Sequence, residues 1–204
     1  MGTWAAFYVK TPDQLKLVEA IRSAIPGITD VAQDQPGSLT NDITPSTNGD
    51  PDRLILSQTN PEWVTVFQNS FDDLGDLCTD LSRDLETSII VTMAQTTSDY
   101  YYFALYDNGV NKREIEACYS DDSESINSGE RFPFENAEPG EKVEYDEEES
   151  YLFDFESLEK YCKQFGFDMY VDPENSKWTL LQAHGYRSIV KNKGSNKKPW
   201  WKLW

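Results

Sequence analysis

Among the residues that could perform acid–base or nucleophilic chemistry, carboxylates are abundant in this sequence and histidine is rare. The 204 residues include 36 aspartates and glutamates but one histidine, His184. A lone histidine excludes a histidine-rich metal site and allows at most one serine–histidine or cysteine–histidine pair. His184 precedes Gly185 and Tyr186, and no Gly-x-Ser-x-Gly nucleophile elbow occurs. We therefore expect His184 to be a structural or surface residue.

Carboxylates are numerous enough for a two-acid or metal-assisted hydrolase, but their spacing selects no particular set. The segment 121–130 places oxygen-bearing side chains at alternate positions, as a calcium loop does, yet Ile126 stands where the EF-hand needs glycine. Neither Gly-x-x-x-x-Gly-Lys nor Gly-x-Gly-x-x-Gly occurs, so no phosphate-cradling loop is predicted. We predict no catalytic residue, no metal site and no cofactor. A carboxylate-dependent, metal-assisted hydrolase is the alternative.

The densest charge in the chain is acidic and lies between residues 121 and 160. Fifteen acidic residues stand against three basic ones there, and the longest acidic run is Asp146, Glu147, Glu148 and Glu149. The whole chain has a net charge of -18 and a pI near 4.3. Such a surface disfavours nucleic acid and anionic lipid and favours cationic partners or plain solubility. We predict a basic protein partner steered by this run, and no nucleic acid. For the segment 121–150 as a whole, we expect a solvated acidic surface segment, and the alternative is that it forms a face for the basic partner.

The segment 191–204 reverses this charge. It contains five lysines, no acidic residue, and the tryptophans Trp200, Trp201 and Trp204. Three tryptophans so close together need burial, a partner or a membrane interface. Because the rest of the chain would be repelled by anionic lipid, we favour docking of this tail on the acidic segment or on a second copy of the chain, which would form a homo-oligomer. A membrane-peripheral protein attached through the Lys/Trp tail is a further alternative.

The cysteines and the N-terminal residues point to a reducing compartment. Cys78, Cys118 and Cys162 are far apart and form no Cys-x-x-Cys motif, so reduced thiols are expected. The first ten residues lack the basic region and cleavage site of a secretory signal. No apolar run approaches the ~18 residues that a membrane helix needs. We expect a cytoplasmic protein without an integral membrane segment.

The elements that must position these side chains are clearest over residues 63–119. Ser70 and Asp73 have the spacing of a capping box, and apolar residues recur behind them with helical period. Asn108-Gly109 is the pair that best tolerates a tight hairpin turn. Alternation places Tyr100 and Tyr102 on one face of a strand, and we expect both faces of that sheet to be covered. The predicted strands here are 63–67, 88–94, 100–106 and 113–119, which with the helix make a central βαβββ unit.

The remaining elements extend this unit. A strand at 4–10 precedes a helix that Thr11 caps and Pro26 ends, and Asp154 caps a third helix that Gly166 ends. The polar segment 28–52 is expected to be a long loop. Shorter strands are predicted at 53–57, 167–171 and 178–183, with a helix as the alternative for 178–183. We therefore predict an α+β fold, a mainly antiparallel sheet with two or three helices packed on one face, in a single domain over 1–190 followed by the tail 191–204.

A partial resemblance covers the central unit. Trp63-x-Val, Leu81-Ser-Arg-Asp-Leu85, the apolar strand 89–93, Ser98-Asp99 and Leu105-Tyr-Asp-Asn-Gly109 resemble a pattern in uncharacterised, small, acidic bacterial proteins. In composition and style the chain also resembles the immunity proteins of bacterial toxin systems. The lack of catalytic motifs and the net charge of -18 lead us to the hypothesis of a non-enzymatic cytoplasmic binding protein for a basic macromolecule, and the resemblance implies toxin neutralisation as one form of it. Its expected partner-binding residues are Asp146, Glu147, Glu148, Glu149, Trp200, Trp201 and Trp204.

Overall fold

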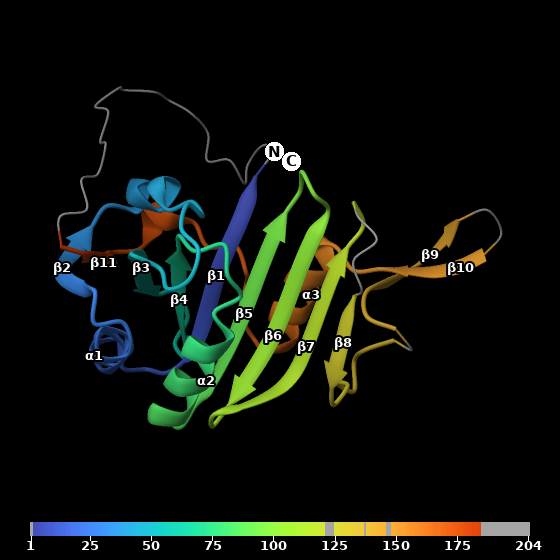
Figure 1. Ribbon diagram of the computed structural model, residues 1–204, viewed down its shortest axis with the longest axis horizontal. Helices are drawn as coiled ribbons and strands as arrows, with labels where there is room; N and C mark the ends of the chain where they lie inside the picture. Colours follow the sequence, from blue (N-terminus) through green and yellow to red (C-terminus); the bar gives the residue numbers. More distant parts are fainter. Residues whose placement is uncertain (1, 121–124, 137, 146–147, 185–204) are drawn as a thin grey trace.

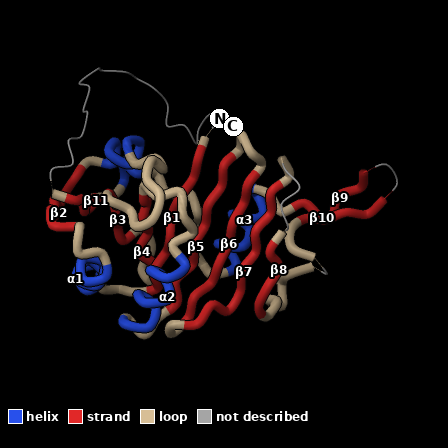
Figure 2. Tube along the Cα trace, viewed as in Figure 1, coloured by secondary structure: helices blue, strands red, loops and turns tan. Residues whose placement is uncertain are grey.

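The computed structural model describes residues 2–120, 125–136, 138–145 and 148–184. Its strands are β1 (Thr3–Lys10), β2 (Ile28–Gln35), β3 (Arg53–Gln58), β4 (Trp63–Gln68), β5 (Ser88–Gln95), β6 (Tyr100–Asp107), β7 (Val110–Cys118), β8 (Ile126–Gly129), β9 (Glu141–Tyr145), β10 (Glu148–Leu152) and β11 (Trp178–Ala183). Its α-helices are α1 (Gln14–Ala24), α2 (Gly75–Asp84) and α3 (Phe155–Gln164), and two short 3-10 helices are η1 (Gly37–Asp42) and η2 (Pro173–Asn175). Strands dominate the fold (Figure 2).

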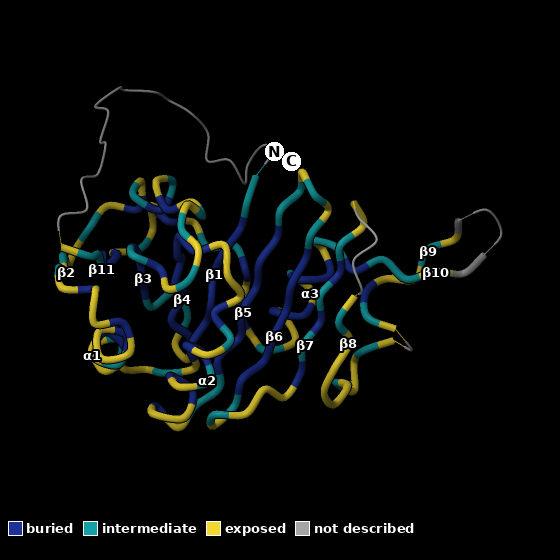
Figure 3. Tube along the Cα trace, viewed as in Figure 1, coloured by how far each residue is buried: buried dark blue, intermediate teal, exposed yellow. Residues whose placement is uncertain are grey.

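Nine of these strands form one sheet, in the order β2-β11-β3-β4-β1-β5-β6-β7-β8. All pairings between neighbouring strands of this sheet are antiparallel. Strand β1 lies in the middle, where Phe7 is opposite Val66 of β4 and Val91 of β5. Because β1 is paired at both edges and covered on both faces, residues 4–9 are all buried (Figure 3). The predicted α+β chain with a large antiparallel sheet is confirmed.

The helices cover both faces of the sheet, so the prediction of helices on one face is wrong. Helices α1 and α2 share a core with Phe7 and Val9, whereas α3 packs in a second core with Trp4 and Tyr8. Figure 1 shows α2 in front of the sheet and α3 behind it. An apolar stripe shows that a helix buries one side, but it does not tell which face of the sheet receives it. Strand β6 contributes to both cores, which confirms that both of its faces are covered.

The segment 63–119 does not form a separate layer. It contains β4, α2, β5, β6 and β7 in that order, but β1 lies between β4 and β5 in the sheet. Strand β11, near the C-terminal end of the described chain, likewise lies between β2 and β3. The sheet is therefore completed by segments from both ends of the described chain, and the sequence pattern within 63–119 did not contain that information.

Two predicted helix starts are wrong and one is right. Helix α1 is capped by Asp13, whose carboxylate accepts from the Lys16 amide at 3.0 Å, rather than by Thr11. Helix α2 begins at Gly75, five residues after Ser70, because Leu74 has a left-handed backbone with φ of 59° that a helix does not include. The Ser70 hydroxyl instead accepts from the Asp72 amide at 2.9 Å and donates to the Gly49 carbonyl at 2.5 Å. Helix α3 is capped by Asp154 as predicted, with the Ser157 amide 2.9 Å from its carboxylate.

The prediction of a loop over 28–52 is wrong for residues 28–35, which form β2, and for residues 37–42, which form η1. Strand β2 is an edge strand with mostly polar residues, and it exists because its backbone pairs with β11. Conversely, the predicted strand 167–171 is not a strand in the structure, where the chain bends at Phe167 and Met169. A short stretch of sequence does not show whether a neighbouring strand is available for pairing. Whether 28–35 and 167–171 form strands therefore depends on segments far away in the chain.

The acidic segment that follows β7 joins the sheet through β8, which pairs with β7, and continues into the β9–β10 hairpin. The hairpin projects from the sheet in Figure 1. Its base is tied to α3 by an ion pair of 2.9 Å between Lys160 and Glu141. Among the described residues, no helix is long and apolar enough to span a bilayer.

Candidate functional site

The residues predicted to bind a partner are largely outside the described part of the chain. Asp146, Glu147, Trp200, Trp201 and Trp204 lie outside the described residues. The backbone of Glu148 and Glu149 begins β10, but their side chains are not among those described. Partner binding, membrane attachment and homo-oligomerisation through these residues therefore stay predictions.

A pocket elsewhere in the fold combines aromatic rings with carboxylates, and we call it the acid–aromatic pocket. Its volume is about 470 Å³, within the usual range for ligand sites. None of the described residues that line it is a lysine, arginine or histidine. It is lined by Thr96, Tyr101, Asp154, Phe155, Glu156, Glu159 and Tyr170.

The aromatic wall of this pocket is built from rings on separate segments. The rings of Phe155 and Tyr170 lie with centroids 5.3 Å apart and planes inclined by 36°. Trp4 of β1 contacts both edge-on, at 6.1 Å and 5.5 Å. Because Trp4 is buried and its indole donates to Thr92 at 2.9 Å, the wall rests on the fixed centre of the sheet.

The acidic side of the pocket comes from the first turns of α3. Asp154 caps the helix, Glu156 lies in its first turn, and Glu159 follows Phe155 by four residues on the same face. The cap satisfies a free amide at the helix start, and acidic residues are favourable there because of the helix dipole. The same local preferences that start α3 therefore place negative charge beside the aromatic wall.

The opposite side is held by the segment after α3. Phe167 inserts between Tyr8 and Trp63, with ring centroids 4.5 Å and 4.7 Å away. The Tyr8 hydroxyl donates to the Met169 carbonyl at 3.3 Å. These contacts anchor both sides of Asp168 and fix the backbone that presents Tyr170.

Electrostatics in the pocket oppose any further negative charge. Burial raises the pKa of the Tyr101 hydroxyl, and the charges of Asp99 and Asp154 raise it further. Burial also raises the pKa of the Tyr170 hydroxyl, with a second contribution from the charge of Glu159. Both hydroxyls therefore stay neutral at physiological pH. A cation entering the pocket would gain from the carboxylates and from the ring faces.

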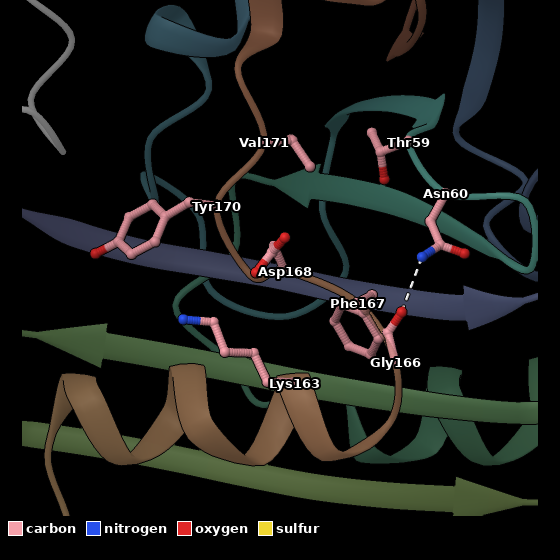
Figure 4. A pocket seen from close by; sticks show the side chains of 8 residues that line it. All are labelled: Thr59, Asn60, Lys163, Gly166, Phe167, Asp168, Tyr170 and Val171. Carbon is pink, nitrogen blue, oxygen red and sulfur yellow. Dashed lines mark hydrogen bonds between the residues drawn. The ribbon is translucent and has the colours of Figure 1, made fainter.

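A second, smaller pocket adjoins the first, and we call it the polar pocket. Its volume is about 280 Å³, and Tyr170 lines both pockets. Figure 4 shows Lys163 on α3, Asp168 and Tyr170 on the following segment, and the Asn60 side chain donating to the Gly166 carbonyl at 2.9 Å. The polar pocket thus offers a mixture of donors and acceptors. Its lining residues are Thr59, Asn60, Lys163, Gly166, Phe167, Asp168, Tyr170 and Val171.

On the other face of the sheet, carboxylates gather in an open acidic cleft at the start of α2. The cleft has a volume of about 520 Å³, and Asp50, Asp72, Asp73, Asp76 and Glu114 are among its lining residues. Three of these carboxylates already accept hydrogen bonds: Asp72 from the Gly49 amide at 2.6 Å, Asp73 from the Gly75 amide at 2.9 Å, and Glu114 from the Tyr102 hydroxyl at 3.0 Å. Across the described chain, no cluster of three or more His, Cys, Asp or Glu residues has the arrangement of a metal site.

The histidine and the cysteines lie away from these pockets or at their margins. His184 is exposed and lies 3.7 Å from the Asp30 carboxylate, so the prediction of a surface histidine is confirmed. The three cysteines are free thiols; Cys78 and Cys162 are buried and Cys118 is partly exposed. Burial raises the pKa of both buried thiols, which keeps them protonated.

No family model, no curated protein and no solved structure matches this chain.

Proposed function

We propose that this protein is a non-enzymatic cytoplasmic binding protein for a basic macromolecular partner, with neutralisation of a basic toxin as one form this function would take. The observation that carries the proposal is the acid–aromatic pocket. It pairs the rings of Phe155 and Tyr170 with the carboxylates of Asp154, Glu156 and Glu159. Aromatic faces and carboxylates together recognise the charged ends of lysine and arginine.

The charge of the whole chain supports the same proposal. A net charge of -18 attracts a cationic protein over several ångströms and raises the rate of encounter. Asp146, Glu147, Glu148 and Glu149 would contribute to this steering. Their contribution would be to the association rate, whereas the pocket would set how long the complex lasts.

The test is binding of a basic probe to the full-length chain. The probe is a 12-residue peptide of alternating lysine and serine, and its control is the same peptide with glutamate in place of lysine. We expect the basic peptide to bind at low ionic strength and to weaken steeply as salt is added, because screening shortens the range of the charges. Equal binding of both peptides, or no salt-sensitive binding of the basic one, would reject the proposal.

A second candidate function is carboxylate-dependent hydrolysis, and the acidic cleft is the observation that favours it. Such hydrolases need two or more carboxylates around the reacting bond, and the cleft gathers several. The measurement is hydrolysis of ester, phosphoester and glycoside substrates with and without added Mg²⁺. Activity that is lost in Asp73→Asn and kept in Glu156→Gln would support this function over the first.

A further inference from the structure

We propose that the acid–aromatic pocket and the polar pocket form one groove that binds an extended segment of the basic partner, with a lysine or arginine side chain in the first pocket and the adjoining peptide backbone across the second. This inference rests on the proposed function and names the group that is recognised. It places the recognition on the α3 face of the sheet rather than at the acidic run 146–149.

The two pockets share their walls. Tyr170 lines both of them. On α3, Phe155 and Glu159 line the acid–aromatic pocket and Lys163 lines the polar pocket. Residues four apart lie on the same face of a helix, so one stripe of α3 forms the side of both pockets. A ligand that fills one pocket is thereby led along α3 into the other.

The first pocket selects a cationic side chain. A bare helix N-terminus attracts anions, but Asp154 already accepts from the Ser157 amide, and Glu156 adds a second negative charge in the first turn. The rings of Phe155 and Tyr170 offer apolar surface for the aliphatic stem of lysine or arginine, and their faces attract its charged end. An anionic side chain would meet only like charge and neutral hydroxyls.

The second pocket suits a peptide backbone. It offers the carboxylate of Asp168 as an acceptor and the ammonium of Lys163 as a donor, and a peptide presents both N–H and C=O groups. Glu159 and Lys163 are one helical turn apart, about 6 Å along the axis. Two residues of an extended chain span about that distance. The seated basic residue and the backbone at Lys163 should therefore be two positions apart.

The groove is formed before any ligand arrives. Phe167 is packed between Tyr8 and Trp63, and the Asn60 amide donates to the Gly166 carbonyl at 2.9 Å. These contacts fix the chain just before Asp168, and the Tyr8 hydroxyl, which donates to the Met169 carbonyl, fixes it just after. A site already in its binding geometry loses less ordering entropy when the peptide binds.

The experiment measures binding of the alternating lysine–serine peptide by groove variants of the full-length chain. Phe155→Leu and Tyr170→Leu keep apolar volume but remove the ring faces, and each should weaken binding by about tenfold. The double variant Glu156→Gln/Glu159→Gln should weaken binding and reduce its salt dependence. A peptide of the same charge with N-methylated serine amides should bind the unaltered chain more weakly, because it lacks the backbone donors.

The matched control is Glu19→Gln/Asp84→Asn, which removes the same charge from α1 and α2 on the opposite face of the sheet. It should bind within about twofold of the unaltered chain, since neither residue lines the groove. Thermal unfolding of each variant shows that the fold is kept. If the unaltered chain binds the peptide and the groove variants bind equally well, the groove inference is overturned while the proposed function stands. If the unaltered chain does not bind, the proposed function itself fails.

Two other occupants are distinguishable outcomes. If truncation after residue 190 raises peptide affinity at least tenfold and a synthetic 191–204 peptide displaces the probe, the groove belongs to the chain's own tail, and an external partner is rejected. If Tyr170→Leu converts a dimer to a monomer in sedimentation, the occupant is a second copy, and the inference is again rejected. A monomer whose affinity is unchanged by truncation supports the external peptide.

Discussion

At the scale of single residues, Arg113 shows how a charge is buried in this fold. Its guanidinium donates to both oxygens of the Glu135 carboxylate, at 2.9 Å and 2.7 Å, and both side chains are fully buried. Further donations reach the Ser128 carbonyl at 2.7 Å and the Asn127 side chain at 2.8 Å. The pair therefore fastens the segment after β8 to β7. In the sequence, Glu135 is one of many acids in a segment expected at the surface, and its burial follows from a partner 22 positions earlier.

Glu135→Gln should destabilise the fold by about 3–5 kcal/mol, because it leaves the Arg113 charge buried without a counter-charge. The free energy of unfolding in denaturant measures this. The double variant Arg113→Met/Glu135→Leu should lose less than Glu135→Gln, since it removes both charges and restores apolar contact. A loss below about 1 kcal/mol in the single variant would show that water reaches the guanidinium.

The effect of Glu116 on folding stability depends on pH. Burial raises its pKa, and the charges of Asp73 and Glu114 raise it further. The folded-state pKa is therefore above the unfolded value, and the ionised carboxylate costs stability at neutral pH. As the pH falls through the raised pKa, the group is protonated in the folded state and the cost is relieved.

Glu116→Gln should accordingly raise the melting temperature at pH 7, and the gain should shrink as the pH falls through the pKa of Glu116. The measurement is thermal unfolding of both proteins between pH 7 and pH 3. Glu19→Gln on α1 is the control, because Glu19 is exposed and should change the melting temperature little at either pH. A gain that persists unchanged at pH 3 would contradict the assignment to this carboxyl group.

At the scale of elements, local capping signals located both ends of α3 but not the starts of α1 and α2. Asp154 and Gly166 start and end α3 as the sequence predicted, and Gly166 has the positive φ of 86° that favours glycine. Ser70 and Asp73 have an equally good capping pattern, but Ser70 donates to Gly49 and Asp73 accepts from Gly75. The contacts of Asp73 and the left-handed backbone of Leu74 are local, whereas the Ser70–Gly49 hydrogen bond joins residues 21 positions apart. The capping pattern shows neither the turn before Gly75 nor this distant contact.

The Asp154 cap yields a test at this scale. Asp154→Ala should destabilise the protein by about 1 kcal/mol, because the Ser157 amide loses its acceptor. Asp154→Asn should be nearly neutral for stability, since asparagine also caps helices. Denaturant unfolding separates the two variants. Equal losses in both would mean that the charge of Asp154, rather than its hydrogen bond, stabilises α3.

At the scale of the whole molecule, the candidate site could not be predicted because its parts are distant in sequence. The lining residues Thr96, Tyr101, Phe155 and Tyr170 come from the turn after β5, from β6, from α3 and from the segment after α3. The sequence indicated that strong antiparallel strands and the α3 helix would form, since those depend on local pattern. It did not indicate that α3 would cross to the face opposite α1 and α2, and the pocket exists because α3 lies there.

In the whole molecule, the acidic run 146–149 and the groove should affect different rate constants for partner binding. Charges that steer a partner act before contact and change the association rate, whereas seated side chains change the dissociation rate. Neutralising Asp146, Glu147, Glu148 and Glu149 together should slow association of the lysine–serine peptide severalfold at low salt and leave dissociation unchanged. At about 1 M salt the difference should vanish, because the screening length falls to about 3 Å.

Tyr170→Leu should show the opposite kinetics, with faster dissociation and unchanged association, because the Tyr170 side chain carries no charge that steers the partner. Stopped-flow measurement of both variants and of Glu19→Gln/Asp84→Asn separates the two effects from a general loss of charge. The control removes two charges from the opposite face and should slow association only slightly. If neutralising the run accelerates dissociation as Tyr170→Leu does, these acids contact the bound peptide directly, and the contact surface extends beyond the groove to the β9–β10 hairpin.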